Sequence, residues 1–418
     1  MAKRRVVVTG LGTVNPLGRS VGEFWSDLIA CKSGIRPLGR FDTTPYSSRI
    51  GGEVQNWEGV SFEGFDPRES KRMDRFAQFA VQGALEAVKD CGIDFASYAP
   101  ERCGVIVGSG IGGLEELETQ HNRMLTKGMD RSSPFTVPKL MANAAAGNIS
   151  IIWRLRGPNF AVVTACASAS SAIGEAYRTL QRGDGVDVMI TGGSEAAVTP
   201  LGLSSFCSLK GLSTRNDDPE HASRPFDMDR DGFLLSEGAG ICVLEELEFA
   251  RKRGAKIYAE LVGYGASGDG YHITAPDPEG NGAVLAMRLA LKDAGMSPEQ
   301  VDYINAHGTS TELGDIAETG AIKKTFGDYA KGGLMISSTK SSTGHLLGAS
   351  GGVAMIASAL AMRDNILPAT LNLTNPDPRC DLDYIPITPR QKKINVALIN
   401  SFGFGGHNAC LLIKRFEG

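Results

Sequence analysis

The sequence predicts an α/β protein assembled from repeated strand–helix units. Continuous runs of β-branched and other apolar residues recur along the chain, which is typical of strands covered on both faces. Segments with helical periodicity lie between these runs, and the alternation indicates βαβ units. We expect strands at residues 5–9, 104–108, 161–164, 187–191, 257–262, 303–306, 335–337, 395–400 and 409–413. We expect helices at 75–90, 168–182, 282–294, 315–326 and 350–363.

The composition fits a large globular protein and excludes several function classes. The chain has 418 residues, of which 42% are hydrophobic, so it can bury a large core. Its formal net charge of −4 gives no general reason to bind nucleic acid or an anionic membrane. No window holds the roughly 18 apolar residues of a membrane span. The 52 glycines predict many tight turns and close backbone approaches.

The cysteines argue for a reducing compartment. There are eight, no two within a CxxC spacing, and their density is low for so long a chain. The basic start is followed by an apolar run too short for a signal peptide. We therefore expect a cytoplasmic protein.

The two halves of the sequence have the same plan. Each begins with a strand that runs into glycines, and each later has a strand, a turn with a reactive residue and a helix. The basic stretch 251–256 is the expected junction. We expect one half at 1–253, which contains Cys166, and a second at 254–418, which contains His307 and His345.

Three patterns are set aside because their context is wrong. The segments 108–113 and 263–268 both fit GxGxxG, but neither has the helix and later acidic residue of a dinucleotide site. Residues 227–232 begin like a calcium loop, but position 12 of that loop is Gly238 instead of Glu. The six histidines have no metal-ligand spacing. We expect no cofactor and no metal.

Cys166 is the strongest candidate for chemistry. It follows an expected strand and precedes a helix rich in small residues. A helix N-terminus favours a thiolate, which would make Cys166 a nucleophile. The alternative is that Cys166 is a buried structural cysteine.

Three further segments combine small or hydroxyl residues with histidine or glycine. They are 305–311 with His307, 338–348 with His345, and 400–408 with its glycines around Phe404. A thiolate can attack an acyl carbonyl, and two imidazoles can hold a second thioester carbonyl as it gains negative charge. The glycine loop could present N–H groups to an oxyanion. Together these features predict thioester chemistry.

These segments, in this order, resemble the β-ketoacyl-acyl-carrier-protein synthases of the thiolase superfamily, most of all the type II members. The carrying motifs are LSTRNDDPEHASRPFD at 212–227, NAHGTSTELGD at 305–315 and STKSSTGHLLGASG at 338–351. The resemblance runs from about residue 6 to about residue 408 and so covers nearly the whole chain. It implies a duplicated thiolase fold in five layers, αβαβα, normally a homodimer.

The resemblance also implies roles for individual residues. Cys166 would take the acyl group, and His307 and His345 would bind the malonyl thioester and support its decarboxylation. The N–H groups of Cys166 and Phe404 would form an oxyanion hole, and the Phe404 loop would act as a gate. Lys340 and Glu318 would organise the site by ion pairing, unless they form only an ordinary structural pair.

The same resemblance implies residues that bind the substrate and the partner. Ile111 and Phe206 match acyl-pocket positions, although plain core packing would also explain them. The remaining substrate positions are Thr309, Thr311, Phe402 and Gly403. Acidic acyl carrier protein is the expected partner, which requires a basic rim. The matching basic residues are Arg68, Lys71, Arg72, Lys127, Arg131 and Lys210, although such a run is often only a solvated face.

Other classes fit less well. Non-catalytic chain-length-factor subunits share the fold but lack the nucleophile, whereas Cys166 and both histidines are intact here. Thiolases use a second cysteine near the C-terminus, and Cys410 lies in a strand pattern instead; synthase III enzymes have Asn in place of His345. A ketosynthase domain of a polyketide synthase is an alternative that these residues do not exclude. His407 replaces a threonine that many bacterial members have, and it is given no catalytic role.

Overall fold

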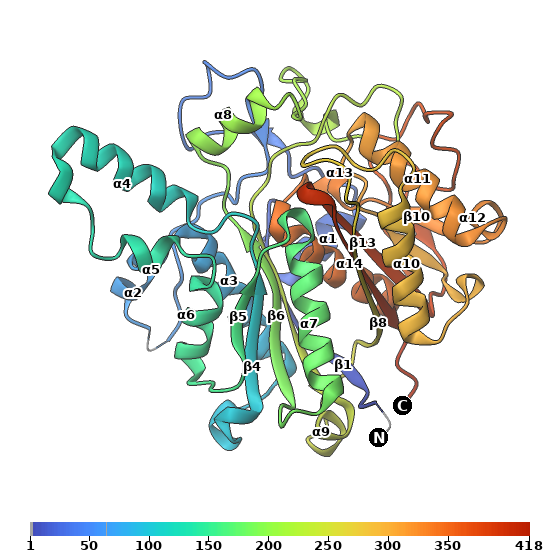
Figure 1. Cartoon of the computed structure of the whole chain (residues 1–418), viewed down its shortest axis with the longest axis horizontal. Helices are drawn as coiled ribbons and strands as arrows, with labels where there is room; N and C mark the ends of the chain where they lie inside the picture. The colour runs from blue at the N-terminus through green and yellow to red at the C-terminus, as the bar shows by residue number, and fades with distance from the viewer. Residues whose placement is uncertain (1–2, 64) are drawn as a thin grey trace.

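The computed structural model describes residues 3–63 and 65–418, and these form an α/β molecule around one large sheet (Figure 1). The sheet has ten strands in the order β10-β9-β13-β14-β8-β1-β7-β6-β4-β5. Its strands are β1 (Val6–Val14), β4 (Cys103–Gly108), β5 (Asn159–Val162), β6 (Val188–Glu195), β7 (Gly238–Glu246), β8 (Ala259–Gly268), β9 (Tyr303–Asn305), β10 (Met335–Ser337), β13 (Val396–Gly403) and β14 (His407–Lys414). Two small sheets pair β2 (Arg36–Pro37) with β3 (Ile50–Gly51) and β11 (Ile366–Leu367) with β12 (Arg390–Gln391).

The strand order repeats around the centre of the sheet. Outward from β1 run β7, β6, β4 and β5, and outward from β8 run β14, β13, β9 and β10. The directions match as well, since β6, β4 and β5 are parallel to one another, as are β13, β9 and β10. Antiparallel pairing of Val6–Val8 with residues 259–261 joins the two repeats.

Helices cover both repeats and fill the space between them. α3 (Arg75–Cys91) packs on β1 and β7, and α10 (Asn281–Ala294) packs on β8 and β14. α7 (Ser168–Arg182) and α14 (Ser350–Asp364) lie between the repeats and contact strands of both. This arrangement confirms the expected αβαβα layers. α14 is buried from Ser350 to Met362, because it is covered on every side.

The other helices lie at the periphery or at the ends of strands. They are α1 (Val21–Ile29), α2 (Pro67–Lys71), α4 (Leu114–Lys127), α5 (Thr136–Leu140), α6 (Ala144–Trp153), α8 (Pro200–Ser208), α9 (Leu247–Lys252), α11 (Glu312–Phe326), α12 (Tyr329–Gly332) and α13 (Lys340–Thr343). Figure 1 shows α4 projecting from the body of the molecule. Within the described ranges, no helix is long and apolar enough to cross a membrane.

The strands and helices expected from the sequence are present, with shifted ends. The largest shift of an end is in β1 and β8, which continue through their glycines instead of ending there, and β7 was not expected from the sequence. A Cβ atom at Gly12 would lie 2.0 Å from the Gly83 oxygen of α3, and one at Gly265 would lie 2.0 Å from the Ala286 oxygen of α10. The glycines therefore let each strand pack closely on a helix, and the GxGxxG match at 263–268 lies within β8.

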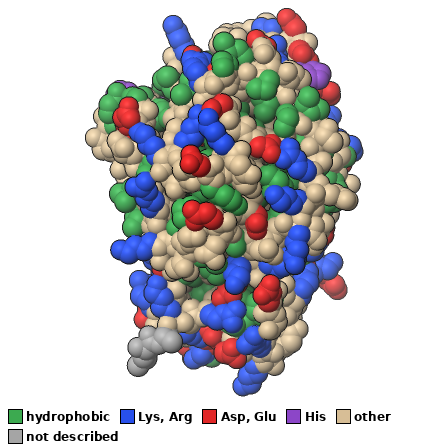
Figure 2. Space-filling view, turned by 90° about the vertical axis from the view of Figure 1, so that its right-hand side faces the viewer, with side chains coloured by type: hydrophobic (Ala, Val, Ile, Leu, Met, Phe, Trp, Pro, Cys, Tyr) green, Lys and Arg blue, Asp and Glu red, His purple; other side chains and the backbone are tan. Residues whose placement is uncertain are grey.

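The surface over α10, α11 and α12 carries mixed charge. Figure 2 shows basic and acidic side chains interspersed on this face. Several are paired, as in Lys324–Glu279 and Lys331–Asp381. This face therefore presents no field of one sign.

Candidate active site

The carboxyl ends of the parallel strands meet around one cavity of about 730 Å³. Cys166 follows β5, His307 follows β9 and His345 follows β10. Since β5 and β10 have the same outermost place in the two repeats, Cys166 and His345 follow equivalent strands. All three line the cavity, together with Phe404 and Glu318. Lys340 does not line it but lies buried nearby, where its charge acts on Cys166.

Cys166 lies in a strained turn at the start of α7. The preceding residue, Ala165, has a φ of 48°, in the left-handed region that non-glycine residues rarely adopt. The hydroxyl of Ser168 stabilises this turn, because it donates to the Ala165 oxygen at 2.6 Å and accepts from the Thr164 N–H at 2.9 Å. Strain held in this way is typical of functional positions.

The surroundings of Cys166 favour the thiol over the thiolate. Burial raises the pKa of Cys166 to about 12, and the negative charge of Glu195 acts in the same direction. The backbone N–H groups of Phe404 and of Cys166 itself, and the charge of Lys340, act in the opposite direction. Burial therefore outweighs the effect of the helix end that the sequence analysis emphasised.

The two histidines lie edge to face, with ring centroids 5.4 Å apart. Nδ1 of His345 lies 2.9 Å from the Ser350 hydroxyl, which fixes one side of its ring. Nδ1 of His307 has no hydrogen-bond partner among the described residues. Burial and the charge of Lys340 lower the pKa of both rings well below 6.5. Both imidazoles are thus neutral at physiological pH, and each can donate one N–H.

The ion pair expected between Lys340 and Glu318 is not formed as a direct contact. The Glu318 carboxylate instead accepts hydrogen bonds from the N–H groups of His307 at 2.9 Å and Gly308 at 2.7 Å, and from Asn400 Nδ2 at 3.0 Å. Lys340 acts on it only through charge. Burial lowers the pKa of Lys340 to about 8.

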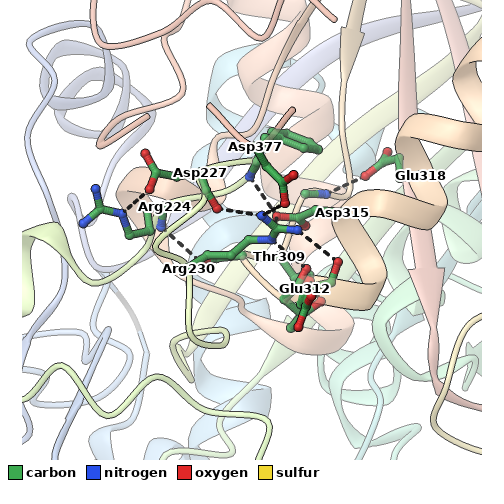
Figure 3. Close-up of polar contacts among 12 residues, drawn as sticks. Arg224, Asp227, Arg230, Thr309, Glu312, Asp315, Glu318 and Asp377 are labelled. Atoms are coloured by element: carbon green, nitrogen blue, oxygen red, sulfur yellow. Dashed lines mark hydrogen bonds and ion pairs between the residues drawn. The ribbon is translucent and has the colours of Figure 1, made fainter. Parts of the chain in front are cut away.

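A buried arginine holds the segment that follows His307. Figure 3 shows Arg230 reaching between Asp377 and the start of α11. It donates from Nε to the Thr311 oxygen at 3.3 Å, from Nη2 to the Glu312 oxygen at 3.1 Å and from Nη1 to Asp377 at 2.8 Å. Hydrogen bonds therefore hold the 307–312 segment at both ends, to Glu318 at its start and to Arg230 at its end.

The calcium-like segment 227–232 belongs to the same network. Asp227 accepts from the N–H groups of Thr374 and Asn375 and from the Arg224 guanidinium (Figure 3). The carboxylate oxygens of Asp227 thus accept hydrogen bonds from the chain itself. Among the described residues, no cluster of three or more His, Cys, Asp or Glu side chains is arranged to hold a metal ion.

The glycine loop ends β13 beside Cys166. Gly405 and Gly406 have φ values of 81° and 72°. The Gly405 N–H donates to the Ile273 oxygen at 2.7 Å, and the Gly406 oxygen accepts from the Asp269 N–H at 2.9 Å. The loop therefore rests on the segment after β8, and the half-buried Phe404 lines the cavity with its backbone N–H directed at the Cys166 sulfur.

The substrate residues expected from the sequence are brought together, and most of the basic residues are not. The cavity lining includes Ile111, Phe206, Thr309, Thr311, Phe402, Gly403 and also Lys210. Arg68, Lys71 and Arg72 lie in or just after α2, and Lys127 and Arg131 lie at the far end of α4, all outside the lining. Arg68 pairs with Asp66 and Arg72 with Glu69 at the surface.

Two buried residues of the site, Glu195 and Arg230, were not predicted from the sequence. Both line the cavity. Glu195 ends β6 at the same edge of the sheet as the reactive residues, so its position after a buried strand was an available signal. Arg230 lies in a long irregular segment, where sequence gave no such signal.

Comparison with known proteins places this geometry in a family. The family model described as "Beta-ketoacyl synthase, N-terminal domain" matches residues 3–250, and "Beta-ketoacyl synthase, C-terminal domain" matches residues 258–374. The chain is 51% identical to a 3-oxoacyl-[acyl-carrier-protein] synthase 2 of Synechocystis, over 100% of this chain and 99% of that protein. It is 49% identical to the protein of the same name from Coxiella burnetii, over 99% of each.

Solved structures agree with these sequence matches. One is a ketosynthase in complex with a type II polyketide synthase acyl-carrier protein and bound to the hexaketide. It is 34% identical with a TM-score of 0.91, and the match covers 99% of this chain and 100% of that one. A second, a β-ketoacyl synthase from Burkholderia phymatum, is 35% identical with the same TM-score, over 99% of this chain and 100% of that one.

Proposed function

The chain belongs to the β-ketoacyl synthase family, and on that premise we propose that it condenses malonyl-acyl-carrier protein with an acyl group held on Cys166. The product is a 3-oxoacyl group two carbons longer, with release of CO₂, and the pathway served is fatty-acid synthesis. The assignment of catalytic roles rests on one observation: Cys166 and two neutral histidines line the same cavity.

In the first half-reaction the Cys166 sulfur attacks the thioester of the acyl carrier. A bond forms between sulfur and the acyl carbon, the carrier's thiolate leaves, and it takes up the proton that Cys166 loses. The raised pKa of Cys166 means that attack and proton removal are linked. The N–H groups of Cys166 and Phe404 are the donors for the oxyanion that forms on the acyl carbonyl.

In the second half-reaction malonyl-carrier loses CO₂. The carbon–carbon bond to the carboxylate breaks, and its electron pair passes to an enolate whose oxygen accepts hydrogen bonds from His307 and His345. Neutral donors suit this step, because they stabilise charge that develops only in the transition state. The enolate carbon then attacks the acyl carbonyl, and Cys166 leaves as a thiolate and takes up one proton from water, which replaces the proton given to the first carrier.

Positioning of the histidines supports these roles. Ser350 orients His345 through Nδ1, which leaves Nε2 for the substrate. Glu318 holds the His307 backbone, and Arg230 holds the segment that carries Thr309 and Thr311. We propose that these two threonines contact the chain that links the thioester to the carrier protein. Ile111, Phe206, Phe402 and Gly403 form the cavity wall for the acyl chain.

The partner is acyl carrier protein, and we assign its docking to Lys210 and to the basic residues in and directly after α2 and α4. Arg68 and Arg72 pair only with exposed carboxylates, and such pairs contribute little, so an acidic partner can replace them. Lys71→Glu should raise KM for carrier-bound malonyl groups and leave a small thioester substrate unaffected. An equal effect on both substrates would argue against docking at this surface.

We further propose a homodimer formed along β5. This strand is the edge of the large sheet; Phe160 in it is 42% exposed, Val163 directly after it is 55% exposed, and Ile151 of the neighbouring α6 is 74% exposed. An apolar edge strand of this kind is covered in stable proteins. Val163→Asp should shift sedimentation toward the monomer; an unchanged dimer would exclude this interface, and a monomeric wild type would exclude the dimer.

The experiment that tests the proposed reaction is a condensation assay with acyl- and malonyl-carrier. Wild type should form the 3-oxoacyl product and CO₂, and Cys166→Ala should form no product while it remains folded. Condensation by the variant would overturn the role of Cys166. The division of the chain at 253/254 and the cytoplasmic location stay predictions.

A further inference from the structure

Glu195 is a buried carboxylate of the cavity that the proposed mechanism does not use. It is the last residue of β6, it has no solvent exposure, and it lines the cavity next to Cys166. A charged group in such a place needs several hydrogen-bond donors.

Four donors surround the carboxylate. Oε1 accepts from the Ser109 hydroxyl at 2.9 Å and the Ile111 N–H at 3.2 Å. Oε2 accepts from the Gly110 N–H at 2.7 Å and the Gly348 N–H at 3.0 Å. The glycine-rich loop that fits GxGxxG thus arranges its N–H groups around an anion, as such loops do, but the anion belongs to the chain itself.

The four donors come from both halves of the molecule. Residues 109–111 follow β4, whereas Gly348 lies in the short helical turn Leu347–Ala349, directly after His345. The loop carries Ile111, which is 42% exposed and faces the cavity, and the turn carries Leu347, which also lines it. One carboxylate therefore fixes two apolar walls of the same cavity relative to each other.

The charge of Glu195 does not assist the nucleophile. It raises the pKa of Cys166, against the effect of Lys340, while His307 and His345 are neutral. Its favourable contribution is thus made through the loop and the turn that it holds.

We propose that Glu195 is a positioning residue that sets the acyl-chain lengths accepted by Cys166, by fixing Ile111 against the turn after His345. This inference rests on the proposed function and deepens it. It assigns to the glycine-rich loop the task of shaping the acyl pocket.

Glu195→Gln is the sharpest test, because the amide has one oxygen. Gly110 and Gly348 can only donate, so that oxygen must face them. The NH₂ group then faces Ser109, whose hydroxyl can accept, and Ile111, whose N–H cannot. The variant therefore frees Ile111 selectively.

The measurement is the rate at which Cys166 is acylated by carriers loaded with short, medium and long chains. We expect the ratio of the long-chain to the short-chain rate to change by about fivefold or more, as for the loss of one buried hydrogen bond. Alkylation by iodoacetamide at fixed pH should become faster, because a negative charge beside the sulfur is removed. A general loss of packing would instead lower all acylation rates together and leave their ratio unchanged.

Two further variants separate the effects. Glu195→Asp keeps the charge but shortens the side chain, so the length ratio should change without faster alkylation; it also carries the test if the Gln variant does not fold. Glu86→Gln is the matched control, since Glu86 also accepts two backbone N–H groups but lies outside this cavity. A folded Glu195→Gln variant with the wild-type length ratio would overturn the inference. A wild type that takes no acyl group from any carrier would overturn the proposed function instead.

Discussion

The backbone of Gly403 lies against that of Cys166, so that a Cβ atom at position 403 would lie 2.9 Å from the Cys166 nitrogen. The same atom would lie 2.8 Å from the Thr164 oxygen. Both neighbours are backbone atoms of a strained turn and cannot move aside freely. This contact holds the Phe404 N–H at the sulfur, where the oxyanion is expected.

Gly403→Ala should therefore impair catalysis more than folding. The added methyl group must displace Phe404, and the loss of one oxyanion donor typically lowers the rate about 10²–10³-fold. Condensation rates and thermal melting, measured together, check this. Gly320→Ala is the matched control, because no neighbour lies within 4 Å of a Cβ there and α11 gains a better helix former. Equal activity of the two variants would contradict the account.

His345→Asn should lower malonyl decarboxylation about 10²-fold or more, because one of the two donors to the enolate is lost. Ser350→Ala should lower it less, since His345 keeps its ring but loses the contact that orients it. CO₂ release from malonyl-carrier measures both variants. If Ser350→Ala were as damaging as His345→Asn, the hydroxyl would have a role beyond orientation.

Decarboxylation should be insensitive to pH in the range where a free histidine titrates. Burial lowers the pKa of His307 and His345 well below 6.5, so both stay neutral as the pH falls through that value. We expect a flat rate from about pH 5.5 to about pH 7, below the pKa of Lys340 near 8. The Cys166→Ala variant is the best material, because it removes the thiol. A rate that changes with an apparent pKa near 6.5 would contradict the lowered pKa values of the two imidazoles.

Arg230→Lys should raise KM for malonyl-carrier about tenfold, the equivalent of roughly 1.4 kcal/mol. Lysine keeps the positive charge beside Asp377 but cannot also reach the Thr311 and Glu312 oxygens. Alkylation of Cys166 by iodoacetamide should stay at the wild-type rate. Arg379→Lys is the control, because Arg379 pairs with Asp377 and with the Glu312 carboxylate without touching those oxygens. Matching KM values in the two variants would remove Arg230 from the positioning of this segment.

Local patterns in the sequence predicted the alternation of strands and helices and the candidate residues, whereas the five layers were implied by the resemblance to the family. A strand, a small-residue turn and a helix are contiguous in the chain, and they placed Cys166 and both histidines correctly at strand ends. β7 was missed because it begins with Gly-Ala-Gly. Gly240 of that strand packs on Gly352 of α14, an approach that only the folded chain reveals.

Contacts between distant segments could not be predicted. Lys340 and Glu318 lie on separate elements, and the expected ion pair depended on a distance that sequence does not contain. Arg230 bonds mainly to backbone oxygens, which every residue possesses, so its partners leave no pattern. The raised pKa of Cys166 likewise comes from burial by both halves of the molecule, not from its place at a helix start.

The most direct test of the central claim is the intact mass of the protein after mixing with acyl-loaded carrier. We predict that wild type gains the mass of the acyl group and that Cys166→Ala, confirmed as folded, gains nothing. An acyl adduct on Cys166→Ala, or none on folded wild type with any chain length, would contradict it.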